Sequence, residues 1–162
     1  MQASEAPIGY MERTRLYYRA LGYPSDYIWA TFDDVAFTPL AKPLSAARIA
    51  LVTTSSAADR ANRDARGVKH VWSGPTDAPP ARLFTDDLAW DKDSTHTNDR
   101  ESFLPVEAVK SLARAGKIAG ITPHFHGVPT EYSHRKTMQE DAPDVLARLR
   151  DERADGVILL PI

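Results

Sequence analysis

The stretch Asp155-Gly-Val-Ile-Leu-Leu-Pro-Ile162 decides the fold that the sequence predicts. An unbroken apolar run after a glycine is typical of a central β-strand that is buried on both faces. In open α/β sheets, the loop that follows such a strand carries the chemistry. We therefore expect a core strand here. Docking of a terminal strand onto the sheet is the simplest explanation of its place at the end of the sequence.

The composition is that of an ordinary globular protein. The 162 residues, 43% hydrophobic and 26% charged, suffice for one domain with a sizeable core. A net charge of −2 gives no reason to expect nucleic acid or an anionic membrane as partner. No run is long enough to cross a bilayer and the N-terminus lacks a basic-then-apolar signal, so we expect a cytoplasmic protein. Without cysteine, these residues can form no disulfide, thiolate metal site or cysteine nucleophile.

The order of the predicted elements indicates a parallel sheet with helices on its faces. We expect an N-terminal helical arm at about residues 7–23, strands at 48–54, 117–122 and 156–161, helices at 105–116 and about 133–154, and short strands at 68–72 and 82–85. Crossovers of this length join parallel strands through right-handed βαβ units. The prediction is a single α/β domain over residues 1–162, with a βαβ core at about 47–162.

His124 and His126 are the sharpest local feature. Because they are two residues apart on an extended segment, their side chains point to the same side, which suits joint contact with a metal or an anion. We expect them at the carboxyl end of strand 117–122, where His96, from the aperiodic segment 86–102, could meet them. Three interpretations stay open: a metal site, a polar substrate pocket and a structural role. Further ligand candidates are Asp91, Asp93 and His134.

Other motifs give weaker signals. Ser55 and Ser56 follow strand 48–54, which ends at Thr54, and a phosphate or carboxylate could bind there, but no glycine-rich turn accompanies them. The sequence has no Gly-x-Ser-x-Gly elbow, no P-loop and no Gly-x-Gly-x-x-Gly fingerprint. None of the protein classes that these motifs define is therefore indicated.

Several stretches, in order along the chain, resemble the selenoprotein B family of glycine, sarcosine, betaine and D-proline reductases. They are Ile8-Gly-Tyr-Met-Glu-Arg-Thr-Arg-Leu-Tyr-Tyr18, Phe37-Thr-Pro-Leu-Ala-Lys-Pro-Leu44, Ala50-Leu-Val-Thr-Thr54, Asp93-Ser-Thr-His-Thr-Asn-Asp-Arg100 with Phe103-Leu-Pro105, and Pro123-His-Phe-His-Gly-Val-Pro129. The likeness covers most of residues 7–162.

The resemblance implies reductive chemistry through a thiol or selenol. In the glycine, sarcosine and betaine branch, a selenolate cleaves the C–N bond of the substrate. In the D-proline branch, the ring is opened reductively with a dithiol as electron donor. The reactive element of the family is a Cys or selenocysteine, two residues, then Cys-His, directly after a strand like 155–161. A helix N-terminus at that edge of the sheet would stabilise the chalcogen as its anion.

The sequence ends at Ile162, where the reactive residue of the family would come next, and it contains no cysteine. We therefore expect a domain truncated after strand 156–161, with no cofactor in this chain and with selenocysteine or cysteine in the missing part. Three explanations stay open: a UGA selenocysteine codon read as a stop, a short subunit whose other half is a separate polypeptide, and an inactive fragment.

The sequence-based expectation is thus a three-layer, Rossmann- or flavodoxin-like α/β domain with a mainly parallel sheet. The resemblance implies the N-terminal portion of a selenol- or thiol-dependent reductase for a small amino-acid-like substrate, inactive alone. Its proton donors would be His96, His124 and His126, and its substrate-binding residues Thr97, Asn98, Thr54 and Ser55.

Two rival functions stay open. One is a histidine-based metal-binding protein or metallohydrolase, with His124, His126 and His96 as ligands. The other is a non-catalytic subunit or dimerising module. Besides the small-molecule substrate, the expected partners are a partner subunit or thiol electron donor, and a second copy of the chain that associates through uncovered sheet surface.

Overall fold

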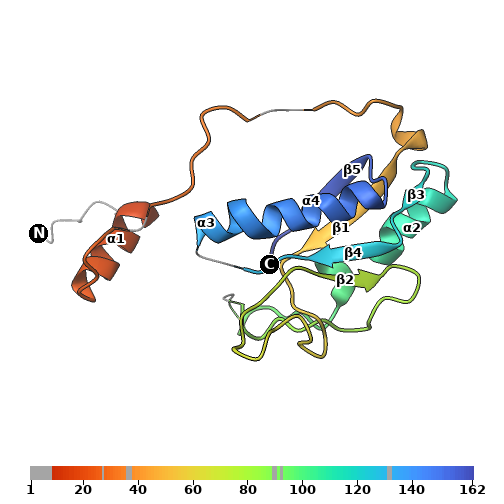
Figure 1. Cartoon of the computed structure of the whole chain (residues 1–162). Coiled ribbons are helices and arrows are strands. Elements are labelled where there is room, and N and C mark those ends of the chain that lie inside the picture. The colour runs from red at the N-terminus through yellow and green to blue at the C-terminus, as the bar shows by residue number, and fades with distance from the viewer. Residues whose placement is uncertain (1–8, 27, 36–37, 89–90, 92, 131–132) are drawn as a thin grey trace, which may run out of the picture. The chain divides into compact units, whose positions relative to one another are not determined.

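The computed structural model describes residues 9–26, 28–35, 38–88, 91, 93–130 and 133–162 (Figure 1). The chain divides into two compact units, Met1–Phe37 and Thr38–Ile162. Ile8 and Phe37, which open two of the stretches that resemble the reductase family, lie outside the described residues. Among the residues that are described, no helix combines the length and the apolar character needed to cross a bilayer.

The first unit contains helix α1 (Tyr10–Ala20), which corresponds to the predicted helical arm. No residue of α1 is buried, and local contacts hold the segment together. The guanidinium of Arg19 donates two hydrogen bonds to the carboxylate of Asp26. The rings of Tyr17 and Tyr18 meet edge to face, as do those of Tyr18 and Tyr23. These contacts fold the segment after α1 back onto the helix.

Within the described residues, the second unit contains one sheet of five strands. They are β1 (Arg48–Thr53), β2 (Trp72–Pro75), β3 (Gly120–Ile121), β4 (His124–Gly127) and β5 (Gly156–Leu160). Strand β1 pairs in parallel with β3, β4 and β5, and β2 pairs antiparallel with β4. The predicted α/β class with a mainly parallel sheet is confirmed at this level.

Strand β1 occupies the middle of the sheet. Its odd-numbered carbonyls, at Ala47, Ile49 and Thr53, accept the N–H groups of Ala119, Thr122 and Val128 on the β3–β4 side. The carbonyl of Arg48 accepts the N–H of Asp155, which leads into β5. Alternate carbonyls of a strand point to opposite edges. Strands β3 and β4 therefore share one edge of β1, and β5 occupies the other.

Helices α2 (Val106–Arg114) and α4 (Ala142–Asp151) pack on opposite faces of this sheet (Figure 1). Side chains of β1 alternate between the faces: Ile49 and Leu51 join Val106 and Val109 of α2, whereas Ala50 and Val52 join Leu149 of α4. Helix α3 (His134–Lys136) leads through a π-helical turn (Thr137–Asp141) into α4, and 3-10 turns lie at Leu44–Ala46 and Arg100–Ser102.

The structure corrects the expected environment of the last strand. The run 156–161 does form a strand, but β5 lies at an edge and its side chains are not buried on both faces. Val157, Ile158 and Leu159 are 41%, 42% and 70% exposed. Among the described strands, β5 pairs with β1 alone, so its other edge makes no ladder with a described strand. An apolar run predicts a strand, but it does not determine how many neighbours the strand has.

The short strands predicted at 68–72 and 82–85 are also displaced. The first lies later, as β2, and the second is reduced to a single bridge between Ser56 and Phe84. Two glycines explain how β2 and β4 fit the core. A Cβ at Gly74 would lie 2.8 Å from Cε1 of Phe125, and one at Gly127 would lie 2.6 Å from Cδ1 of Trp72. The backbone therefore passes directly under two aromatic rings.

Candidate functional site

The sequence predicted His124 and His126 just beyond the carboxyl end of strand 117–122. They lie on β4, and His126 is level with Val52 in the parallel ladder with β1. The chain bends at Pro123. The N–H of Thr122 donates to the carbonyl of Ile49 at 3.0 Å, and β4 resumes pairing along the same edge of β1 after a shift in register, since Ile49 pairs with Ile121 and Val52 with His126. The histidines therefore lie within the sheet, on the face covered by α4.

Glu152, just beyond α4, lies between the two histidines. Its Oε1 is 2.6 Å from Nδ1 of His124, and its Oε2 is 3.9 Å from Nε2 of His126. The backbone N–H of His124 also donates to Oε2 at 3.3 Å. A carboxylate can only accept, so Nδ1 of His124 carries the proton of this hydrogen bond, and the ring is half-exposed. The predicted pairing of the histidines on one side is therefore organised by a carboxylate.

His126 is 1% exposed and its Nε2 has no hydrogen-bond partner. Burial lowers the pKa of His126, the nearby carboxylate of Glu152 partly offsets this, and the imidazole is consequently neutral near pH 7. Its Nδ1 lies 2.9 Å from Oγ of Ser73 on β2. Because the carboxylate of Glu152 favours a proton on the facing nitrogen, we assign the Nε2–H tautomer, in which Nδ1 accepts from the serine hydroxyl.

Arg148 of α4 completes this cluster. Its Nη1 donates to Oγ of Ser73 at 2.9 Å. Asp144, one helical turn earlier, accepts from Nε at 2.8 Å and from Nη2 at 3.1 Å. The carboxylate thus fixes the guanidinium over the serine hydroxyl. Strand β2, strand β4 and helix α4 therefore bring a hydroxyl, an imidazole, a cation and a carboxylate together.

His96 lies elsewhere, at an open cavity of about 480 Å³ that it lines with Thr97 and Asn98. The hydroxyls of Thr85 and Thr97 are 2.6 Å apart, and the guanidinium of Arg82 donates to the side chain of Asn98. The N–H of Asn98 donates weakly to Nδ1 of His96, at 3.4 Å. The predicted residues of segment 86–102 therefore do line one cavity, but His124 and His126 are not among its walls.

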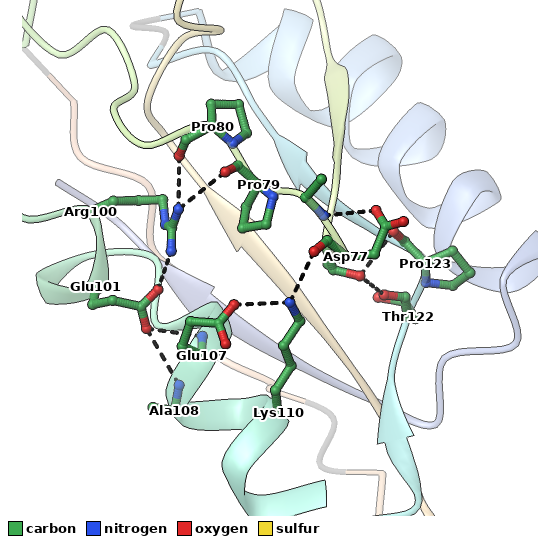
Figure 2. A network of polar contacts seen from close by, with 12 residues as sticks. Asp77, Pro79, Pro80, Arg100, Glu101, Glu107, Ala108, Lys110, Thr122 and Pro123 are labelled. Atoms are coloured by element: carbon green, nitrogen blue, oxygen red, sulfur yellow. Dashed lines mark hydrogen bonds and ion pairs between the residues drawn. The ribbon is translucent and has the colours of Figure 1, made fainter.

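Arg100, in segment 86–102, connects this segment to Pro79 and Pro80 by hydrogen bonds (Figure 2). Its Nη1 donates to the carbonyl of Pro80 at 2.8 Å and more weakly to that of Pro79, and its Nη2 donates to Glu101. The other oxygen of Glu101 accepts the backbone N–H groups at the start of α2. Figure 2 also shows Lys110 of α2, which donates to Glu107 and to the carbonyl of Asp77. The cavity at His96 is thereby anchored to α2.

Thr54 and Ser55 serve the fold at the carboxyl end of β1. Oγ1 of Thr54 accepts the N–H of Ile162 at 2.9 Å. Ser55 is buried, its hydroxyl is 3.2 Å from Oγ1 of Thr53, and its carbonyl accepts Nε1 of Trp72 at 3.0 Å. Their polar groups are therefore engaged within the protein.

The arrangement supports proton transfer on the α4 face more directly than metal binding. Within the ranges that the structure describes, no three His, Asp or Glu side chains are placed to hold one metal ion. The sequence reasoning missed Ser73, Arg148 and Glu152. Glu152 follows His124 by 28 residues, and Ser73 precedes His126 by 53. No motif spacing connects such residues, and only the pairing of β2 with β4 and the placement of α4 bring them together.

Comparison of the chain with protein-family models, with curated proteins and with solved structures finds no match. The geometry and the stretches described above therefore carry the functional argument.

Proposed function

We propose that this chain is the N-terminal portion of a selenol- or thiol-dependent reductase for a small amino-acid-like substrate of the glycine, sarcosine, betaine or D-proline type. The observation that carries the proposal is the cluster of His124, Glu152 and His126, whose two histidines lie on one of the stretches that resemble this family. The parallel pairing of β1 with β4 and β5, and the helices on both faces, support a Rossmann- or flavodoxin-like domain as its scaffold.

The cluster can supply protons for reductive cleavage. Breaking a C–N bond reductively requires two electrons from a selenol or thiol pair, and a proton for the leaving amine. These 162 residues contain no cysteine, so the electrons come from a group outside them, and the chain alone is inactive. Histidine is suited to proton donation near neutral pH. A proton that leaves His124 can be replaced through Glu152, which also faces His126.

The cavity at His96 offers the polar walls that a small zwitterion requires. Thr97 and Asn98 contribute a hydroxyl and an amide, and Arg82 contributes a cation for a carboxylate. This cavity is therefore a second candidate position for the substrate, separate from the cluster at His124, with His96 as its proton donor. Thr54 and Ser55 lie at the carboxyl end of β1.

Ligand titration tests this function without the redox group. Glycine, sarcosine, betaine and D-proline are added separately to the chain, and the imidazole resonances of its histidines are followed by NMR. We expect at least one of the four to shift the resonances of His96 or His124 saturably. Asn98→Ala should weaken this effect and Ser111→Ala, on the exposed side of α2, should not. Resonances that stay unmoved by all four ligands, or turnover by the chain with dithiothreitol alone, would contradict the proposal.

We also propose that two copies of the chain associate through the outer edge of β5. The exposed apolar side chains of Val157, Ile158 and Leu159 support this, as does the edge of β5 that pairs with no other described strand. Sedimentation velocity of the wild type should show a dimer, and Leu159→Lys should dissociate it. A monodisperse wild-type monomer at high micromolar concentration would contradict this interface.

A further inference from the structure

Ser73 and His126 form a pair whose geometry fits covalent catalysis. They face each other in the antiparallel β2–β4 ladder, so their side chains lie on the same face of the sheet. Oγ of Ser73 is 2.9 Å from Nδ1 of His126. The serine is exposed, whereas the histidine is buried. A reachable hydroxyl in contact with a shielded imidazole is the basic arrangement of a nucleophile and its general base.

The opposite edge of the imidazole faces a carboxylate. Nε2 of His126 is buried and has no hydrogen-bond partner, and Oε2 of Glu152 lies 3.9 Å from it. When Nδ1 takes up a proton, the ring becomes positive in a shielded environment, where a nearby negative charge stabilises it more than it would in water. Hydrogen bonds of catalytic groups are often long before a substrate binds. Glu152 is therefore placed as the group that orients and stabilises the base.

Arg148 acts on the oxygen of the serine itself. Its guanidinium donates to Oγ at 2.9 Å and is held in place by Asp144. A cation at this distance lowers the cost of negative charge on the oxygen. The same group can stabilise negative charge that develops on an acyl oxygen beside it.

Ser73 also borders a cavity. This open cavity of about 570 Å³ lies between β2 and residues 57–64, and Ser73 lines it with Trp72, Val71 and Asn62. Its walls combine apolar side chains with a few polar ones, as is usual for sites that bind small molecules. It is separate from the cavity at His96, with which it shares no lining residue.

We propose that Ser73 is a catalytic nucleophile that accepts acyl groups from small activated esters in this cavity. Oγ attacks the carbonyl carbon while its proton passes to Nδ1 of His126, and the ester C–O bond then breaks as Nδ1 returns the proton to the departing alcohol. Water hydrolyses the acyl-serine by the same route, giving a carboxylic acid and regenerating the hydroxyl. No electrons are transferred, so this activity requires no redox group.

A fluorophosphonate probe tests the nucleophile directly, because Oγ displaces fluoride from phosphorus and retains the label. We expect one label per chain, located on the peptide that contains Ser73 by mass spectrometry. Ser73→Ala should abolish labelling, and the matched change Ser111→Ala, at an exposed serine of α2, should leave its rate unchanged. His126→Gln should lower the rate about 100-fold, the usual contribution of a general base. No label, or a label on another residue, would overturn the proposal.

The role of Glu152 is tested by steady-state hydrolysis of p-nitrophenyl acetate. As a positioning residue it should affect the chemical step, so Glu152→Gln should lower kcat about 10-fold at an unchanged KM, and Glu152→Asp should restore part of the loss. Circular dichroism of each variant confirms that it is folded. A folded Glu152→Gln protein with wild-type kcat would remove Glu152 from the proposal, and hydrolysis that persists in Ser73→Ala would refute the nucleophile.

Discussion

Replacing Gly127 by alanine tests the packing that places β4 and its histidines. A Cβ at this position would lie 2.6 Å from Cδ1 of Trp72 and closer still to Nε1, so the indole has to move. Trp72 packs edge to face on Phe125, with ring centroids 5.4 Å apart, and its Nε1 donates to the carbonyl of Ser55 at 3.0 Å. The clash therefore affects a packing contact and a hydrogen bond together.

The size of the effect follows from these contacts. Inserting a methyl group into a well-packed site costs about 1–3 kcal/mol. Loss of the indole hydrogen bond adds about 1 kcal/mol, and weakening of the aromatic pair adds about 0.5–1.5 kcal/mol. Alanine regains about 0.5–1 kcal/mol because it restricts the unfolded chain. We expect Gly127→Ala to lower the free energy of unfolding by about 1.5–5 kcal/mol.

Gly120→Ala is the matched control. Gly120 also lies in a strand that pairs with β1, but a Cβ there would meet no atom within 4 Å. The unfolded-state gain of alanine is the same in both variants, so the difference between them isolates the clash. Urea denaturation followed by far-UV circular dichroism measures both free energies. If the two variants differ by less than about 0.5 kcal/mol, the close approach of Trp72 to Gly127 is wrong.

Three further predictions concern the scaffold. The pKa of Asp155 is lowered by the hydrogen bond from the backbone N–H of Arg48. The stability that this carboxylate contributes is therefore present above its ordinary pKa and is lost as the pH falls through the lower pKa of the folded state. The difference in urea midpoint between wild type and Asp155→Asn should narrow below about pH 4, and a constant difference would contradict this. Arg100→Ala should speed chymotrypsin cleavage between Pro80 and Arg100, because the hydrogen bond between these two residues holds the ends of this segment together. An unchanged cleavage rate would show that Arg100 does not stabilise the segment. Leu104→Ala should lower the free energy of unfolding by about 2–5 kcal/mol because Leu104 is fully buried. Leu112→Ala, at an exposed position of the adjoining α2 helix, should lower it by under about 1 kcal/mol. Equal decreases in the two variants would refute the predicted core.

Helices and strands whose pattern and end signals lie close together in the sequence were predicted well. The apolar, β-branched run at 48–54 is strand β1, and the helix expected between Pro105 and Gly116 is α2. In both cases a periodic pattern and the residues that end it lie next to each other in the chain. The α/β class follows from their order, because crossovers of this length join parallel strands.

The environment of a predicted element was harder to infer. The apolar run of β5 was correctly read as a strand, but its outer side is exposed because only β1 pairs with it among the described strands. Pro123 was expected just beyond the end of a strand, whereas the chain only bends there and resumes pairing with β1 as β4, so His126 enters the sheet. Neighbour number and strand continuation depend on pairing between distant segments, which local patterns do not encode.

Both functional proposals depend on one chemical property of His126, the position of its proton. As the base for Ser73, its Nδ1 must carry a lone pair that accepts from the hydroxyl. For a proton lost by His124 to be replaced through Glu152, Nε2 of His126 must carry a proton. The neutral Nε2–H tautomer meets both demands, and the carboxylate that faces Nε2 favours it. Nitrogen-15 shifts of the ring distinguish the tautomers, and a proton on Nδ1 would leave Ser73 without a base and would remove the proton of His126 that faces Glu152.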